Sequence, residues 1–168
     1  MWLVAAGGTF SAFFILAANG FMQSPVGFEV NNGRAVMNDF AALLANPRAW
    51  YLFLHTISSG LVTAAFFMLG ISAYHLLKKQ DEKAFRISFK MAAIVGFFAT
   101  LAVIGSGDTQ GRFLKSVQPM AAAASEAHFE TQDPADFILI AGFEPDGKTL
   151  TWSVKIPKAL SMLYYMKP

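Results

Sequence analysis

Three long apolar runs organise the first part of the chain. They cover residues 1–22, about 50–77 and about 87–105, and Lys90 is the one charged side chain inside them. About 20 apolar residues in a helix are enough to cross the hydrocarbon core of a bilayer. The pattern therefore predicts an all-α integral membrane helical bundle with three transmembrane helices, in a transmembrane region that covers residues 1–105.

The pattern changes after this region, where polar residues and turn residues become frequent. The stretch GSGDTQG, residues 105–111, is typical of a loop at the membrane exit. Pro119 and the alanines that follow it predict a short helix that continues to about Glu130. We therefore expect residues 106–168 to form a loop region outside the bilayer.

A β-hairpin is predicted later in this loop region. Apolar and polar side chains alternate at the period of a strand, with the apolar ones at Leu150, Trp152, Val154 and Ile156. Residues 145–147, Pro-Asp-Gly, provide a turn between this run and the apolar run before it. The final stretch, LSMLYYMKP, is typical of the start of another amphipathic helix.

The composition supports a membrane protein. Hydrophobic residues make up 55% of the chain and charged residues 14%, whereas soluble domains usually carry about a quarter charged residues. The net charge of +2 is too small to indicate a nucleic-acid partner. Because the chain has no cysteine, disulfides, thiolate metal sites and iron–sulfur clusters are excluded. Histidine, methionine and carboxylates are the available metal ligands.

The basic residues predict the orientation of the chain. The loop between the second and third apolar runs holds Lys78, Lys79, Lys83 and Arg86 against Asp81 and Glu82. The positive-inside rule therefore places residues 78–86 in the cytoplasm and residues 106–168 on the external side. Lys90 lies one turn from Arg86 and is expected to anchor the third span by reaching the cytoplasmic interface.

The first apolar run has no basic residues before it, so a secretory signal peptide is not indicated. An apolar run that starts at residue 1 without flanking charge is typical of a helix whose preceding loop lies outside the sequence. We therefore expect the chain to be part of a longer protein.

His55 is an ionisable side chain inside the second apolar run. Trp50 and Tyr51 mark the outer interface, so His55 lies about 8 Å deeper along the helix. Ser58 and Ser59 follow on the same face and leave room for a flat group. A neutral imidazole is an axial ligand for haem iron. The alternative is a histidine hydrogen-bonded to a neighbouring helix, with the small residues serving helix packing.

The other ionisable candidates are less specific. His75, beside the basic loop, is expected at the cytoplasmic interface without a ligand role, and His128 is expected on the solvated surface of the loop region. Glu126 and Glu130 are four residues apart, on one face of the predicted short helix. Two carboxylates at this spacing either accept protons from a quinol or form a hydrated face.

Three stretches of the sequence together resemble subunit I of the cytochrome bd-type quinol oxidases. They are ILAANGFMQSPVGFEVNNGRAVMNDF, HTISSGLVTAAFFMLGISAYHLLK and GDTQGRFLKSVQPMAAAASEAHFET, in the order of the family and through nearly the whole chain. The resemblance implies that the chain covers a middle part of the subunit. This part would hold the fourth to sixth transmembrane helices and the start of the external quinol-binding loop, the Q-loop.

The family oxidises quinol at the outer face of the bacterial cytoplasmic (inner) membrane and reduces dioxygen to water with haems b558, b595 and d. The resemblance implies that His55 is an axial ligand of the haem b558 iron and that Glu126 takes part in quinol oxidation. Ser11 and Ser59 match hydroxyl positions implicated in proton movement. The resemblance also implies ubiquinol or menaquinol as substrate, oxidase subunit II and a small accessory subunit as partners, and no nucleic acid.

The chain departs from the family pattern in two respects. Ala121 occupies the position five residues before Glu126 where the family often has a lysine, and Lys115 is a candidate replacement. The methionine that completes haem b558 and the helices that hold haems b595 and d lie outside this sequence, so we expect this part alone to be inactive.

Two alternatives belong to other functional classes. One is a cofactor-free three-helix membrane scaffold or assembly partner, and the other is a membrane-bound b-type electron carrier without oxidase activity. A low-spin b haem that is lost on His55→Ala would separate the enzyme from the scaffold.

Overall fold

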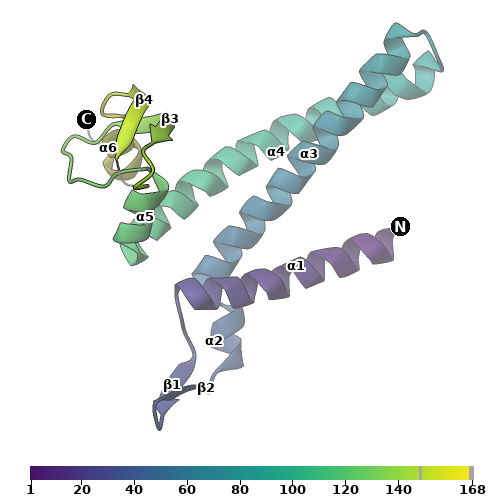
Figure 1. The fold of residues 1–168 in the computed structure, drawn as a ribbon. Helices are drawn as coiled ribbons and strands as arrows, with labels where there is room; N and C mark the ends of the chain where they lie inside the picture. The colour runs from purple at the N-terminus through teal and green to yellow at the C-terminus, as the bar shows by residue number, and fades with distance from the viewer. Residues whose placement is uncertain (148, 167–168) are drawn as a thin grey trace. The chain divides into compact units, whose positions relative to one another are not determined.

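The structure, a computed structural model, describes residues 1–147 and 149–166, and it confirms the predicted fold class. Three helices in the described part of the chain are long and apolar enough to cross a membrane. They are α1 (Trp2–Gln23), α3 (Pro47–Leu77) and α4 (Glu82–Val117) (Figure 1). The shorter elements are β1 (Phe28–Asn31), β2 (Arg34–Met37), α2 (Phe40–Leu44), α5 (Pro119–Ser125), β3 (Phe137–Phe143), β4 (Leu150–Ile156) and α6 (Ala159–Tyr165).

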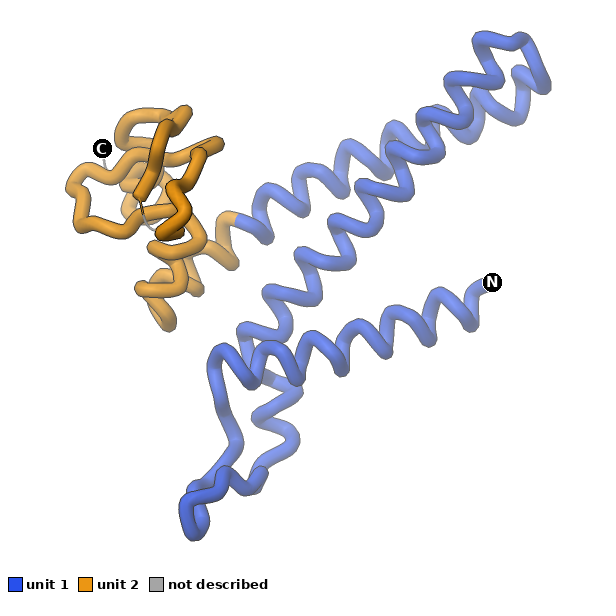
Figure 2. The backbone as a smooth tube through the Cα atoms, viewed as in Figure 1, with its two compact units in different colours: residues 1–107 blue, residues 108–168 orange. Residues whose placement is uncertain are grey.

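The chain forms two compact units, unit 1 with residues 1–107 and unit 2 with residues 108–168 (Figure 2). Unit 1 contains α1, the β1–β2 hairpin, α2, α3 and most of α4. Unit 2 contains the end of α4 together with α5, the β3–β4 hairpin and α6.

Small residues lie where the long helices of unit 1 approach most closely, and Phe13 of α1 also packs against Trp50 and Phe53 of α3. A Cβ atom on Gly20 of α1 would lie 2.9 Å from the backbone nitrogen of Ala49 of α3. A Cβ atom on Gly96 of α4 would lie 3.2 Å from the Cβ atom of Ala65. Bulky apolar side chains such as Phe67 are exposed. This arrangement is typical of membrane helices, which pack through small residues.

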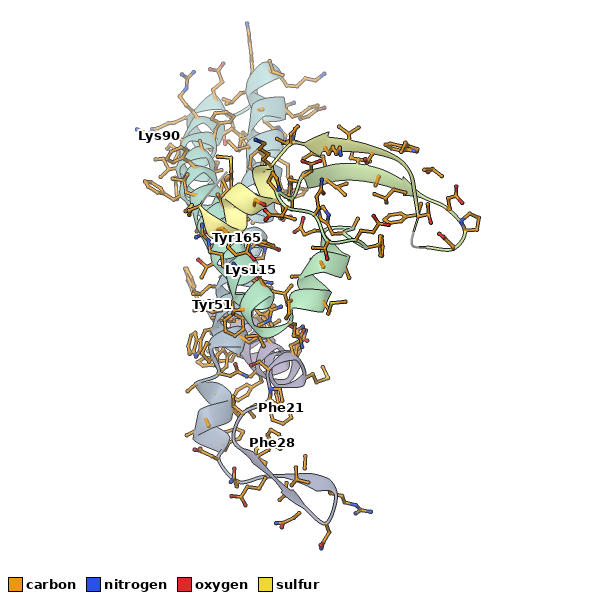
Figure 3. All side chains as sticks on the ribbon, turned by 90° about the vertical axis from the view of Figure 1, so that its left-hand side faces the viewer. Phe21, Phe28, Tyr51, Lys90, Lys115 and Tyr165 are labelled. Atoms are coloured by element: carbon orange, nitrogen blue, oxygen red, sulfur yellow. The ribbon has the colours of Figure 1, made fainter. Side chains whose placement is uncertain are left out.

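The connection between α1 and α3 contains a hairpin that the hydrophobic pattern does not predict. β1 and β2 pair antiparallel, and Asn32 and Gly33 form the turn with φ angles of 49° and 75°. These positive φ angles are required by a two-residue hairpin turn, and Asn-Gly is its common sequence. The Asn32-Gly33 dipeptide is therefore the sequence feature that could have predicted this hairpin. Phe21 at the end of α1 packs edge-on against Phe28 of β1, with ring centroids 6.0 Å apart (Figure 3).

Polar side chains fix the starts of α2 and α3. Asp39 accepts a hydrogen bond from the backbone N–H of Ala42 at 2.9 Å, and Asn46 accepts one from the N–H of Arg48 at 2.9 Å. Asn46 also donates to the backbone carbonyl of Ser24 at 2.8 Å. Its side chain is almost fully buried. Asn46 therefore both caps α3 and ties its start to the end of α1.

Helix α4 continues to Val117, so the prediction of a loop over residues 105–111 is wrong. A glycine costs about 1 kcal/mol in a helix interior, which weakens the helix without forbidding it. Local bonds support the helix here. Arg112 pairs with Asp108 one turn earlier, with Nε 2.9 Å from the carboxylate, which is a stabilising spacing on a helix.

Helix α5 ends at Ser125, so the prediction of a helix to about Glu130 is also wrong. Ala127 adopts a left-handed conformation with φ of 56°. The N–H of His128 then bonds to the carbonyl of Ala123 at 2.9 Å, which is the hydrogen bond of a Schellman helix end. Glu126 and Glu130 consequently do not share a helical face.

The predicted β-hairpin and the final short helix are confirmed. β3 and β4 pair antiparallel from Phe137 opposite Ile156 to Phe143 opposite Leu150. α6 follows directly and buries Leu160. The loop region thus has a folded structure of its own in unit 2.

Candidate functional site

His55 lies on α3 with one edge of its ring against α4. Its Nδ1 is 3.2 Å from the Oγ of Ser106. The next residue, Gly107, is so near that a Cβ atom on it would lie 3.3 Å from the Cε1 of His55. The hydrogen bond to a neighbouring helix, which the packing alternative requires, is therefore present. The other ring nitrogen, Nε2, has no hydrogen-bond partner among residues 1–147 and 149–166.

The face of α3 that continues from His55 has space for a flat group. The hydroxyl of Ser59 donates to the carbonyl of His55 at 2.8 Å, and that of Thr63 donates to the carbonyl of Ser59 at 3.0 Å. Both hydroxyls are thus turned back onto their own helix. No neighbouring atom lies within 4 Å of a Cβ atom placed on Gly60. An imidazole nitrogen without a partner and small residues beside it are a combination that would fit a haem, and His55 is the residue that would hold it.

Arg48 lies two turns from His55, on the same face of α3 by helical spacing. Its side chain is buried, at 5% exposure, and its Nε donates to the Oε1 of Gln23 at 2.6 Å. Its Nη1 is buried without a hydrogen-bond partner in the described part of the chain. One face of α3 thus carries the Arg48 guanidinium, whose Nη1 has no hydrogen-bond partner among the described residues, and the Nε2 of His55.

The structure does not bring Ser11 and Ser59 together. Ser11 is exposed on α1, whereas Ser59 is half-buried on α3, and no hydrogen bond joins them within the ranges described. His75 lies in the last turn of α3. Its Nδ1 is 2.8 Å from the Oε1 of Gln80, and its ring stacks on Phe85 with the centroids 4.2 Å apart.

A second group of polar side chains surrounds a pocket of about 760 Å³ in unit 2. Its lining includes Lys115, Glu126, His128, Ser161, Tyr164 and Tyr165. The volume lies in the range of pockets that bind small molecules. The pocket is therefore large enough for an aromatic ring of the quinol type.

Glu126 directly follows α5, and its backbone N–H bonds to the carbonyls of Ala122 and Ala123 at 3.2 Å each. Burial raises the pKa of the Glu126 carboxyl above its ordinary value, and the nearby charge of His128 partly opposes this increase. A carboxylate with a raised pKa is a stronger proton acceptor when it is ionised. Glu130, in contrast, is exposed.

Tyr164 is a pocket residue that the sequence analysis missed. Burial raises the pKa of its hydroxyl, and the negative charge of Glu126 adds to the increase. The hydroxyl therefore keeps its proton at neutral pH and is a hydrogen-bond donor. The sequence feature that could have indicated Tyr164 is the pair of adjacent tyrosines at the end of the short apolar helix.

Lys115 brings a basic group to the same pocket as Glu126. Its Nζ donates to the backbone carbonyl of Tyr164 at 3.1 Å and lies 3.8 Å from the ring centroid of Tyr165 (Figure 3). Ala121, at the position where a lysine was expected from the family pattern, is exposed on α5.

His128 is half-buried, so the expectation that it belongs to the solvated surface is wrong. Its Nε2 is 2.8 Å from the backbone carbonyl of Asp136. Since a carbonyl only accepts hydrogen bonds, Nε2 carries a proton. The turn at the end of α5 directs the chain back toward β3 and brings His128 to this carbonyl.

Asp136 holds the loop that carries this contact. Its carboxylate accepts hydrogen bonds from the Nζ of Lys155 at 2.7 Å, the backbone N–H of Lys158 at 3.0 Å and the side chain of Gln132 at 3.3 Å. The bond from Lys155, followed by that from Lys158, lowers the pKa of Asp136 to about 2. These partners lie up to 22 residues away in the sequence, so no local motif reveals them.

The family model described as cytochrome bd terminal oxidase subunit I matches residues 1–168. Cytochrome bd ubiquinol oxidase subunit 1 of Bacillus subtilis (strain 168) is 48% identical over 99% of this chain and 36% of its own length. Cytochrome bd-II ubiquinol oxidase subunit 1 of Escherichia coli (strain K12) is 38% identical over 96% of this chain and 32% of its own length.

The fold has a similar counterpart among solved structures. The structure of bd oxidase from Geobacillus thermodenitrificans matches 98% of this chain with a TM-score of 0.85 and 35% identity, over 38% of the matched chain. This chain therefore spans between 32% and 38% of the length of these relatives.

Proposed function

This chain belongs to the cytochrome bd terminal oxidase subunit I family, and we propose that it is the part of such a subunit that oxidises quinol at the outer face and passes the electrons to haem b558. The whole protein would be a quinol:oxygen oxidoreductase of the bacterial cytoplasmic membrane, acting with oxidase subunit II. Residues 78–86 would face the cytoplasm and residues 106–168 the external side.

The observation that carries the proposal is the state of the His55 ring. Its Nδ1 is occupied by Ser106, whereas Nε2 has no partner among the described residues and lies beside a face of small residues. His55 would hold the haem through this nitrogen, and any other ligand to the haem would come from elsewhere in the subunit. A b-type haem supplies a one-electron acceptor.

Glu126 is proposed as the proton acceptor in quinol oxidation. A quinol that becomes a quinone releases two electrons and two hydroxyl protons, so a base at the binding pocket is required. Ionised Glu126, whose pKa is raised by burial, would take the first proton, release it to the external side, and then take and release the second proton in the same way. The hydroxyl of Tyr164 would donate a hydrogen bond to a quinol oxygen and orient the ring in the pocket.

The charge separation follows from this arrangement. Protons taken from quinol leave on the external side, whereas dioxygen reduction in the full subunit, at haems b595 and d, would consume protons from the cytoplasm. Charge is therefore separated across the membrane without a pump. Ser11 and Ser59 are proposed to take part in proton movement.

His55→Ala in the full-length subunit, assembled with its partners in membranes, tests the proposal. We expect the low-spin b-haem signal to disappear from the reduced-minus-oxidised absorption spectrum, while the inserted subunit is still detected by immunoblot. His75→Ala is the matched control, because it removes the other histidine of the same helix, and its spectrum should be unchanged.

Retention of the low-spin b haem in the His55→Ala protein would overturn the ligand assignment. It would favour the packing role of His55 and, for this part of the chain, the scaffold alternative.

A further inference from the structure

The hydroxyl of Ser106 has more partners than it has protons. Its Oγ lies 2.6 Å from the carbonyl of Ala102, 3.2 Å from the carbonyl of Val103 and 3.2 Å from the Nδ1 of His55. A hydroxyl donates one hydrogen bond and accepts others, whereas a carbonyl only accepts. The short distance to Ala102 shows where the proton goes, as in serines that bond back to the preceding helical turn. The oxygen is then an acceptor toward His55.

This assignment determines the tautomer of His55. If the Oγ of Ser106 accepts, Nδ1 of His55 must carry the proton of the neutral imidazole. Nε2 then holds the lone pair, and this is the nitrogen without a partner among the residues described. A metal-binding histidine usually donates its other N–H to an oxygen, which fixes the ring and strengthens the ligand.

We propose that Ser106 is a positioning residue for haem b558, because it holds His55 as the Nδ1–H tautomer and directs Nε2 to the iron. The inference rests on the proposed function of His55 and extends it to a residue on another helix. Gly107 supports the same geometry, since a side chain there would meet the Cε1 edge of the ring at 3.3 Å. The Nδ1–Cε1 edge of the ring thus faces two consecutive residues of α4, of which Ser106 makes the hydrogen bond.

The inference predicts an effect on the redox potential. A hydrogen bond donated by Nδ1 makes the imidazole a stronger electron donor, which stabilises the oxidised iron. Loss of the acceptor should therefore raise the midpoint potential of the haem. A serine that serves only helix packing would not change this potential, because it would act on stability and not on the electronics of the ligand.

The experiment compares Ser106→Ala with Ser106→Thr in the full-length oxidase, by spectroelectrochemical titration of the low-spin b haem. Ser106→Ala should raise the midpoint potential and lower the haem-to-protein ratio after detergent washing, with a loss of haem affinity of about 10-fold. Ser106→Thr keeps an acceptor hydroxyl and should restore both values. Ser116→Ala is the matched control, since Ser116 also donates to its own helix, at 2.7 Å to Phe113.

The outcomes separate this inference from the proposed function. If His55→Ala removes the haem but Ser106→Ala leaves the potential unchanged, the role of Ser106 is refuted and that of His55 stands. If His55→Ala keeps the haem, the proposed function itself fails. Should Ser106→Ala not accumulate, Ser106→Cys, with its weaker acceptor, must raise the potential relative to Ser106→Thr, and an equal potential would refute the inference.

Discussion

The Nζ of Lys155 lies 2.7 Å from the carboxylate of Asp136, so an ion pair joins strand β4 to the residue that precedes β3. Asp136 is buried, with 9% of the residue exposed. Its carboxylate also accepts a hydrogen bond from the backbone N–H of Lys158. This carboxylate therefore connects β4 and the start of α6 to the residue that precedes β3. His128 bonds to the backbone carbonyl of the same residue.

Asp136→Asn should weaken the β3–β4 hairpin at neutral pH. The folded loop lowers the pKa of Asp136 to about 2, below the ordinary value near 3.9. Its contribution to stability is therefore complete above about pH 4 and is lost as the pH falls to about 2. Hydrogen exchange of residues 137–156 should be faster in the variant at pH 7, and the difference from the parent protein should shrink toward pH 2.

Glu130→Gln is the control for this measurement, since Glu130 is an exposed carboxylate of the same loop. A difference between Asp136→Asn and the parent that stays constant down to pH 2 would contradict a role for the charge of Asp136.

Glu126→Gln should slow quinol oxidation by about 100-fold, because general-base catalysis typically contributes at least this factor. Glu126 accepts a proton only when it is ionised, and burial raises its pKa. The rate of quinol oxidation by the parent should therefore increase as the pH rises through the pKa of Glu126. The rate of the Glu126→Gln variant should not depend on pH in this range. Stopped-flow reduction of the b haem by quinol measures the step, and dithionite reduction should remain unchanged. Glu144→Gln is the control, since Glu144 is an exposed carboxylate that does not line this pocket, and it should behave like the parent. A Glu126→Gln rate equal to that of the parent would exclude Glu126 as the base.

Lys115→Met should release α6 from the pocket. The substitution removes the hydrogen bond to the carbonyl of Tyr164 and the cation–π contact with Tyr165, and the latter is worth about 1 kcal/mol. We expect faster hydrogen exchange over residues 159–165 and a higher KM for quinol. Lys115→Arg keeps the charge above the ring and should lie between the parent and Lys115→Met. A KM that changes while α6 stays protected would indicate that Lys115 acts on the quinol directly.

Gly20→Ala should destabilise the contact between α1 and α3. The added methyl group would lie 2.9 Å from the backbone nitrogen of Ala49, and overpacking of this kind costs about 1–3 kcal/mol. Gly7→Ala is the control in the same helix, because no neighbouring atom lies within 4 Å of that position. Thermal unfolding of the detergent-solubilised subunit should show a lower midpoint for Gly20→Ala only. Equal unfolding midpoints for Gly20→Ala and Gly7→Ala would contradict a close contact between α1 and α3 at Gly20.

The elements that could be predicted from sequence are those in which local pattern and final structure agree. α1 and α3 follow from continuous apolar runs, and the β3–β4 hairpin follows from alternation around a Pro-Asp-Gly turn. The extension of α4 through Gly105 and Gly107 could not be read from the glycines. Helical hydrogen bonds continue through such residues when neighbouring turns support them. The end of α5 at Ser125 could not be predicted, because the alanines around it favour a longer helix. The left-handed conformation of Ala127, which ends the helix, depends on the tertiary structure of unit 2 and not on the local sequence.

The candidate site shows the same division. His55 and Glu126 could be singled out because a histidine in an apolar span and a carboxylate in a resembling stretch are local signals. Ser106 could not, since it lies 51 residues from His55 and its hydroxyl resembles any other serine in a helix. Asp136 and Tyr164 likewise gain their roles from partners that are distant in the sequence.

The buried positions of α1, α3 and α4 are, apart from Arg48, all small: Ala17, Gly20, Ala49, Ala65, Ser72, Ala92, Gly96 and Ala99. The helices therefore approach one another most closely at small residues. A larger contact joins α1 to α3, where Phe13 packs against Trp50 and Phe53 with ring centroids 4.9 and 5.4 Å apart. Bulky apolar side chains such as Phe67 and Phe98 stay exposed on the same helices, so in a membrane they would face lipid or further helices of the full-length subunit.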